Sequence, residues 1–349
     1  MNGPIAKPHA RTLRKIALVA LKVAVSVTIL SYLFYQAWQD DSFRTLYERT
    51  KQWPLLALAL VVALTAVALT IVRWYVLVRA LDIPFTLRDA IRLGFLGFLF
   101  SLLALGVVGG DAIKAAFLAR SLKARRTEAV ATVVVDRLLG LYALVLLASA
   151  AFLFFYVDPA KVKDPSELAL LQRVCRVTVG LTIAGGVAMG IMLLPGFSTW
   201  PIWEWLTRLP WAGPFIARLV EALRMYRRRV GRMAAMLLLS IVTHAMFAVS
   251  VYFVAHGLGS DAPTLGAHLV VVPISLVASA LPLGAFEYIL DVTYHAVSPA
   301  GAVERQGFVI ALAFRLIMLG VATVGIAYWL IGRREVRELV QEAREEQAA

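Results

Sequence analysis

Charged residues interrupt the apolar stretches of this sequence where ionic chemistry could take place. In "GVVGGDAIKAAFLAR", Asp111 follows two glycines and precedes Lys114 by three residues. In "VVVDRLLGLY", Asp136 and Arg137 are neighbours. An ionised side chain in the middle of a membrane-spanning helix costs about 2.5 to 3.5 kcal/mol on insertion scales. Each of these residues therefore needs a partner or a polar cavity.

The glycines before the acid, Gly109 and Gly110, predict a break in the helix at membrane depth. Irregular backbone is tolerated there only where protein or a water-filled cavity satisfies its polar groups. A helix that began at Asp111 would direct free N–H groups into that cavity and could bind phosphate or carboxylate, with Lys114 adding a positive charge. The alternative is that Asp111 only caps its helix and Lys114 snorkels; capping would not exclude the site.

A second group of the same kind occurs later in the chain. The segment "SALPLGAFE" contains Gly284 and Glu287, and "AFRLIML" contains Arg315. Arg315 follows Glu287 by 28 residues, much as Arg137 follows Asp111 by 26. We expect Glu287 to be the partner of Arg315.

The adjacent pair Asp136 and Arg137 cannot share one helix face, because neighbours on a helix point about 100° apart. We expect one of the two to pair with one of the glycine-broken segments and the other to line the cavity. A purely structural network of ion pairs is the alternative that stays open.

Three further titratable residues, Glu287, Asp291 and His295, recur at every fourth position and would share a helix face. They could relay protons, but we favour the interpretation that they form a solvated outer rim of the protein. His244, in "SIVTHAMF", is expected to be a hydrogen-bonded core residue.

Catalysis would need a nucleophile, paired carboxylates or a metal cluster, and no such set is evident. Asp111 and Glu287 form the only candidate carboxylate pair. The lone Cys175 excludes an internal disulfide and a cysteine-built metal site. We expect neither a metal nor a cofactor, and no enzyme activity.

The composition predicts a membrane protein. Of the 349 residues, 60% are hydrophobic and 16% are charged, and the mean hydropathy is +0.78. The net charge of +13 is explained by basic residues kept on the cytoplasmic side, and not by a nucleic-acid partner.

The apolar segments predict an all-α polytopic fold. Six are long enough to cross a bilayer, near 15–37, 54–79, 129–157, 174–195, 231–256 and 307–331. Two other regions, 91–120 and 268–298, each consist of two short arms joined by a glycine or proline break. They are expected to be re-entrant hairpins, so that the integral membrane domain covers 1–333 and a polar cytoplasmic tail covers 334–349.

The loop charges support this count of six spans. Under it the basic clusters all face one side, and the opposite loops are balanced or acidic. Both termini are then cytoplasmic, as in a multi-pass protein of the inner (cytoplasmic) membrane. The two hairpins enter from opposite sides, which favours an inverted repeat of the kind that transporters use to bind substrate near the midplane. Two unrelated hairpins are the alternative.

The segments "GGDAIKAAFLAR", "EAVATVVVDRLLGL", "SALPLGAFE" and "FRLIML" resemble the landmarks of the lysylphosphatidylglycerol synthase transmembrane region family. The likeness extends over nearly the whole chain, although the usual Pro-Gly-Gly run before the glutamate is shortened here. The resemblance implies a lipid flippase. Some members are fused to a soluble aminoacyltransferase domain. The polar end of this chain is expected to leave no room for such a domain, so the resemblance implies translocation of a lipid without its synthesis.

Two classes of function follow from these observations. In the first, a phospholipid or polyprenyl-phosphate-linked lipid with an anionic headgroup crosses the membrane through a hydrophilic cavity gated by the hairpins. In the second, the protein is a membrane enzyme or an accessory subunit acting on polyprenyl-phosphate-linked sugars or aminoacylated phospholipids. A solute transporter is a weaker third class, because no ion-coupling motif is evident.

Overall fold

The computed structural model confirms the all-α prediction, because the part of the chain that it describes is largely helical. It describes residues 8–102, 106–121, 126–155, 164–193, 229–280, 284–299 and 301–331, with isolated positions between 203 and 226. The predicted tail at 334–349 lies outside this range.

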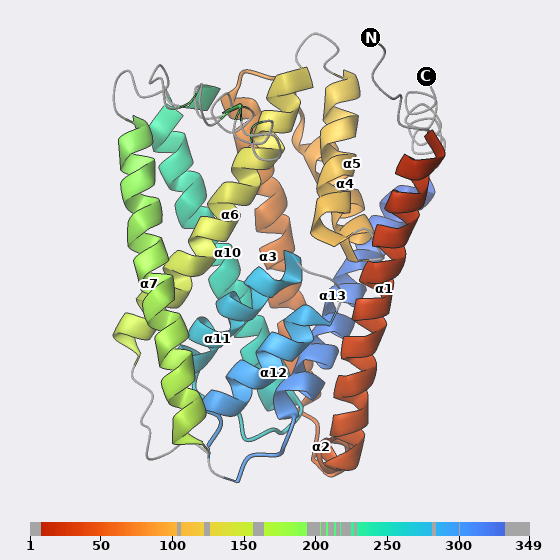
Figure 1. Ribbon diagram of the computed structural model, residues 1–349, viewed down its shortest axis with the longest axis vertical. Helices are drawn as coiled ribbons and strands as arrows, with labels where there is room; N and C mark the ends of the chain where they lie inside the picture. Colours follow the sequence, from red (N-terminus) through yellow and green to blue (C-terminus); the bar gives the residue numbers. More distant parts are fainter. Residues whose placement is uncertain are drawn as a thin grey trace.

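Six long helices run the length of the bundle (Figure 1). They are α1 (Pro8–Gln39), α3 (Trp53–Ala80), α6 (Arg126–Phe154), α7 (Pro165–Leu193), α10 (Val230–Gly257) and α13 (Gln306–Ile331). Within the described residues, five of them are long and apolar enough to cross a membrane. The side chains of α1 are described only from residue 24 onward, so its crossing as a sixth span stays a prediction.

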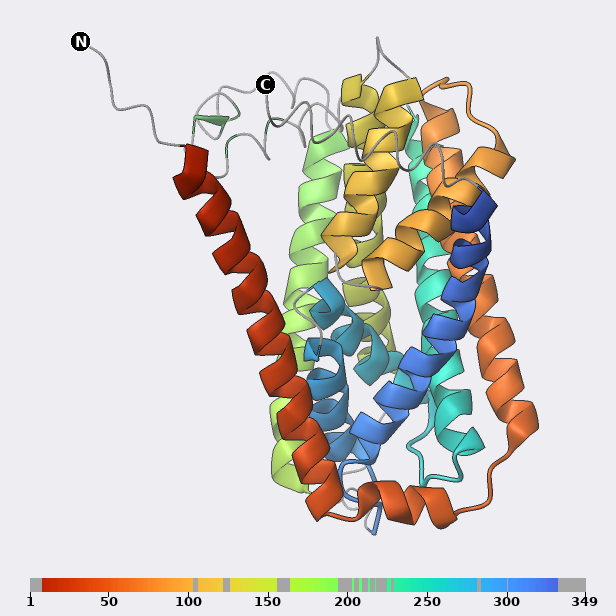
Figure 2. The ribbon, with the colours of Figure 1, turned by 90° about the vertical axis from the view of Figure 1, so that its right-hand side faces the viewer.

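The two hairpins enter the bundle from opposite ends (Figure 2). The first consists of α4 (Leu87–Phe100) and α5 (Gly106–Ser121) and enters from the end where α1 begins. The second consists of α11 (Leu265–Val277), the short 3-10 helix η5 (Ala278–Ala280) and α12 (Ala285–Val297). Because α5 packs against η5, the tips of the two hairpins meet inside the bundle.

Threonine N-caps start the first arm of each hairpin. The hydroxyl of Thr86 accepts a hydrogen bond from the backbone N–H of Asp89 at 3.2 Å, and Thr264 accepts one from Ala267 at 3.3 Å. Each cap satisfies one of the free N–H groups of its helix and fixes where the chain turns back into the bundle.

The order and direction of the helices support the inverted repeat. The set α3, α4, α5 and α6 is followed, after α7, by α10, α11, α12 and α13, which run the opposite way (Figures 1 and 2). The equivalent helices α3 and α10 pack along each other more extensively than any other described pair. Their backbones come close because α3 presents small, fully buried residues such as Ala59, whose carbonyl accepts a hydrogen bond from Ser250 at 2.8 Å.

Helix α7 lies at the edge of the bundle and exposes an apolar surface. Val177, Leu181, Ile183 and Val187 are each more than half exposed. A continuous apolar surface of this kind is unfavourable in water and suits lipid. The outer surface of the bundle is thus that of a membrane protein.

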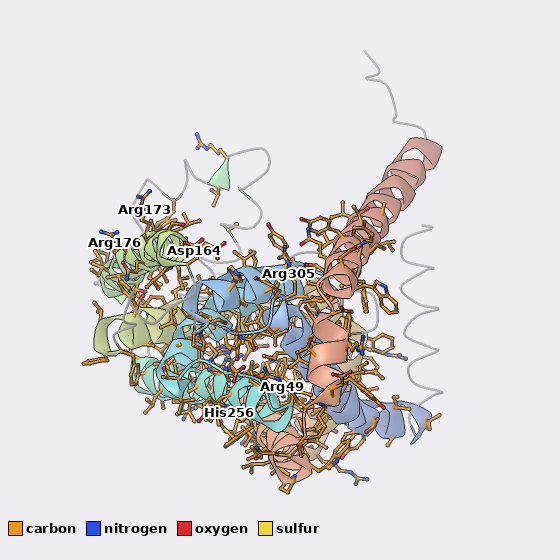
Figure 3. The ribbon with its side chains drawn as sticks, turned by 90° about the horizontal axis from the view of Figure 1, so that it is seen from below. Arg49, Asp164, Arg173, Arg176, His256 and Arg305 are labelled. Atoms are coloured by element: carbon orange, nitrogen blue, oxygen red, sulfur yellow. The ribbon has the colours of Figure 1, made fainter. Side chains whose placement is uncertain are left out.

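The ends of the bundle differ in charge as the topology predicts. The end where α1 begins carries Arg79, Arg88 and Arg92, whereas acids and bases are balanced at the other end, where Asp41, Asp164 and Asp261 occur with Arg44, Arg49 and Arg305. Figure 3 looks onto this second end, which we call the balanced end and where the short helix α2 (Ser42–Glu48) also lies.

Cysteine labelling tests which end faces the cytoplasm. Cysteines at Thr50, Ser166 and Thr264, all exposed at the balanced end, should react with a membrane-impermeant maleimide in intact cells. A cysteine at Arg88, exposed at the basic end, should react only after permeabilisation. The buried Cys175 gives little background. Labelling of the cysteines at Arg88 and at Ser166 from the same side of the membrane would contradict the topology.

Candidate functional site

An ion pair joins the first hairpin to the next long helix. Arg137 of α6 uses Nε and Nη2 to bind both carboxylate oxygens of Asp111 of α5, with 2.6 Å between Nη2 and Oδ1. Such a two-pronged contact is the strongest geometry for this pair. The Asp111 side chain is 13% exposed and that of Arg137 is 40% exposed. This confirms that one member of the Asp136–Arg137 pair binds a hairpin.

The other member, Asp136, does not line a cavity as expected. It forms a buried ion pair with Arg73 of α3, with 2.8 Å between Nε and Oδ1 and only 4% of each side chain exposed. Arg73 also donates from Nη1 to the hydroxyl of Ser240 of α10 at 2.8 Å. The sequence reasoning missed Arg73, although a lone arginine in "TIVRWYVL" is itself a signal of a buried partner.

Lys114 does not snorkel to the surface. Its side chain is buried, and Nζ lies 5.5 Å from the centroid of the Trp74 ring, a cation–π contact. Within the described part of the chain it has no carboxylate ion pair, but it lies in electrostatic range of four charged residues. Together they form what we call the first cluster: Arg73, Asp111, Lys114, Asp136 and Arg137. Its three basic groups outnumber its two acids.

The helix that carries Asp111 begins earlier than predicted. Helix α5 starts at Gly106, so Gly109 and Gly110 are helical and Asp111 is not at the helix start. The expected anion site at the N–H groups of Asp111 is therefore wrong. The glycine at 110 has another role, because a Cβ there would overlap the Ser101 hydroxyl and the carbonyl oxygen of Gly97 on α4.

Gly110 is thus required for packing of the two arms, and Gly110→Ala should destabilise the protein. We expect a loss of about 1 to 3 kcal/mol, typical of overpacking, measured as thermal stability in detergent. The matched control is Gly190→Ala on α7, where a Cβ would meet no atom within 4 Å. Equal stability of the two variants would contradict this role.

The second hairpin carries the equivalent ion pair. Glu287 of α12 accepts a hydrogen bond at Oε1 from Nε of Arg315 of α13, as predicted. The Glu287 side chain is 1% exposed and that of Arg315 is 28% exposed. The helix break before it is also confirmed, since Gly284 caps α12 with a positive φ of 98° that strongly favours glycine.

The acids of α12 are not a solvated outer rim. Glu287 and Asp291 are both buried. Asp291 pairs with Arg305 at 2.9 Å and accepts a hydrogen bond from the backbone N–H of Phe308 at 3.0 Å. His295 lies nearer the surface, at 30% exposure, between Glu167 and Glu304.

Arg305 stays charged at the end of the bundle that Figure 3 shows, where it lies near α1. Burial opposes its charge, but its hydrogen bond to Asp291 and the attraction of that carboxylate outweigh it, so the pKa of Arg305 lies above its ordinary value. Arg305 also donates to Gln36 of α1. The second hairpin is therefore tied to α1 as well as to α13.

The other residues that the sequence analysis singled out add nothing beyond ion pairing and hydrogen bonding. His244 lies beside the backbone of Gly140 and near Arg73. Both ring nitrogens are buried, and neither has a hydrogen-bond partner of ordinary geometry within the described residues, so the expected hydrogen bond of this core histidine stays a prediction. In the same part of the chain, no three His, Cys, Asp or Glu side chains are grouped as a metal site. What the site offers is ion pairing and hydrogen bonding.

The arrangement of hairpins and ion pairs can be compared with known protein families. The family described as the lysylphosphatidylglycerol synthase TM region matches residues 19–325. The chain belongs to this family. In this member of the lysylphosphatidylglycerol synthase TM region family, the matched region includes both hairpins and every ion pair described above. A comparison with curated proteins finds no match.

Proposed function

We propose that this protein translocates a lipid with an anionic or phosphate-linked headgroup across the membrane. One observation carries the proposal: two hairpins enter from opposite ends, meet at their tips, and each holds an acid paired with a partly exposed arginine on the next long helix. This is the arrangement expected of an inverted repeat whose halves expose one central site in turn.

The charges favour an anionic headgroup. Arg137 and Arg315 are partly exposed, and a guanidinium matches the geometry of a phosphate. Lys114 adds a buried ammonium that has no ion pair in the described part of the chain. A headgroup phosphate could therefore bind beside the hairpins while its acyl or polyprenyl chains stay in lipid.

The structure gives the enzyme alternative no added support. The only candidate carboxylate pair was Asp111 and Glu287, and each binds an arginine of its own half of the protein. Two carboxylates engaged in this way are poorly suited to act together as acid and base. We therefore propose a transporter without catalytic activity, in the cytoplasmic membrane with both termini in the cytoplasm, as the loop charges favour.

Reconstitution tests the proposed function. The purified chain in phosphatidylcholine liposomes should move fluorescent phosphatidylglycerol between leaflets, seen as growing access of a membrane-impermeant quencher. Fluorescent phosphatidylcholine, whose headgroup has no net charge, should move more slowly. Leaflet exchange no faster than in protein-free liposomes for every anionic lipid tested, polyprenyl phosphate included, would contradict the proposal.

A further inference from the structure

One face of α12 carries a titratable side chain at each turn, from the hairpin tip to the balanced end of the bundle. Glu287 lies near the tip, Asp291 one turn further and His295 at the rim. Residues four apart lie above one another on a helix. Exposure rises along the series, from 1% for the Glu287 side chain to 30% for that of His295.

His295 lies between two carboxylates at the rim. Its Nδ1 contacts Glu167 of α7, and its Nε2 lies 3.3 Å from Glu304 in the turn before α13. An imidazole can take up a proton at one nitrogen and release it from the other. The outermost group of the series is thus suited to pass protons between the water and the buried acids.

The other charged and titratable groups that the described elements bring to α12 are few. Most are already engaged: His268 binds Tyr294, and Arg305 binds Asp291. They are Arg315 of α13, Arg305 and Glu304 of the preceding turn, Glu167 of α7 and Asp164 just before it, His268 of α11, Tyr32 of α1 and Asp40 just after it. Arg315 is the one that bonds to Glu287.

The Glu287–Arg315 pair is incomplete on both sides. The Oε2 atom of Glu287 is buried and has no hydrogen-bond partner in the described part of the chain. Arg315 uses only Nε in this pair, and its side chain is 28% exposed. A buried carboxylate oxygen without a partner is costly, and this free oxygen is the position at which Glu287 can accept a proton. Once Glu287 is neutral, the guanidinium of Arg315 is free to bind another anion.

We infer that Glu287 couples lipid movement to a proton gradient, by alternating between its pair with Arg315 and a protonated form that releases Arg315 to a headgroup phosphate. This inference rests on the proposed function. One proton passes from the water through His295 and Asp291 to Glu287, and one anionic headgroup takes the place of the carboxylate on Arg315. On the other side of the membrane the proton leaves Glu287, the ion pair forms again and the headgroup is displaced. Proton and anion move together, so no net charge crosses.

The experiment separates a pH gradient from an electrical one. The full chain is reconstituted in phosphatidylcholine liposomes with a trace of fluorescent phosphatidylglycerol, and valinomycin with equal potassium holds the potential at zero. A gradient of one pH unit should shift the final ratio of the probe between leaflets by up to about tenfold toward the less acidic side. A potassium diffusion potential without a pH gradient should not shift it. The final ratio does not depend on the orientation of the protein in the liposomes.

Variants identify the coupling residue. Glu287→Gln should abolish the shift in final ratio, and His295→Gln should slow its development. The matched control is His256→Gln on α10, whose ring binds the carbonyl of Tyr252 away from this series; it should show the full shift. If Glu287→Gln does not fold, as judged by gel filtration, the inference is still tested by the shift in final ratio with the wild type and by the slower response of His295→Gln.

Each result has a distinct meaning. Movement of the probe that follows the potential or a sodium gradient and ignores pH would overturn the inference while leaving the proposed function in place. A full pH response in folded Glu287→Gln would do the same. Absence of movement of every anionic lipid in wild-type liposomes would overturn the proposed function and this inference with it.

Discussion

Asp136→Leu should lower the free energy of unfolding by about 3 to 5 kcal/mol, because it leaves Arg73 charged, buried and without its carboxylate. Both side chains of this pair are 4% exposed, so water cannot take over the role of the lost partner. Thermal unfolding in detergent, or the yield of monodisperse protein, measures the effect.

The double variant Arg73→Met with Asp136→Leu is the control for this prediction. Replacing a whole buried ion pair by apolar residues of similar size is often neutral or stabilising. We therefore expect the double variant to be clearly more stable than Asp136→Leu alone. If the single variant is as stable as the wild type, Arg73 and Asp136 do not form a buried pair in the folded protein.

Reversing the charge of Arg137 should abolish transport. Arg137→Asp would bring a second carboxylate next to Asp111, and like charges in such a site repel strongly. Adding Asp111→Arg restores an ion pair with its members exchanged. We expect the exchanged protein to recover its stability while its lipid transport stays at least about tenfold below wild type, a difference of about 1.4 kcal/mol.

The exchanged variant distinguishes two roles of this pair. If the pair only holds α5 to α6, the exchanged protein should transport lipid at the wild-type rate. If the guanidinium of Arg137 binds the headgroup from α6, moving it to α5 displaces it and transport stays low. Arg176→Gln, on the exposed surface of α7, is the control and should transport normally.

The hairpins and their ion pairs could be predicted from the sequence because their signals are local. A glycine break with short apolar arms requires a hairpin, and an acid in the second arm requires a base nearby. The Glu287–Arg315 pair followed from such signals and is confirmed. For the first hairpin the sequence predicted only that one of Asp136 and Arg137 pairs with a hairpin, and the structure shows that Arg137 does so through Asp111.

Contacts between distant segments could not be predicted in this way. The partner of Asp136 is Arg73 on α3, which lies 63 residues earlier in the chain and belongs to another apolar span. Asp291 read as a solvated residue because its partner, Arg305, lies in a turn and belongs to no periodic pattern. The sequence indicates a helix break at Gly110, because one sequence does not distinguish a glycine that breaks a helix from a glycine that lets two helices pack closely.

The central claim is that a lipid headgroup binds beside the paired arginines of the two hairpins. The most direct measurement uses phosphatidylglycerol with a photoreactive group on its headgroup, cross-linked to the reconstituted protein and mapped by mass spectrometry of its peptides. We predict adducts in α5, α6, α12 and α13 that an excess of unlabelled phosphatidylglycerol removes. Adducts found only on the lipid-facing surface of α7, or unaffected by the competitor, would contradict the claim.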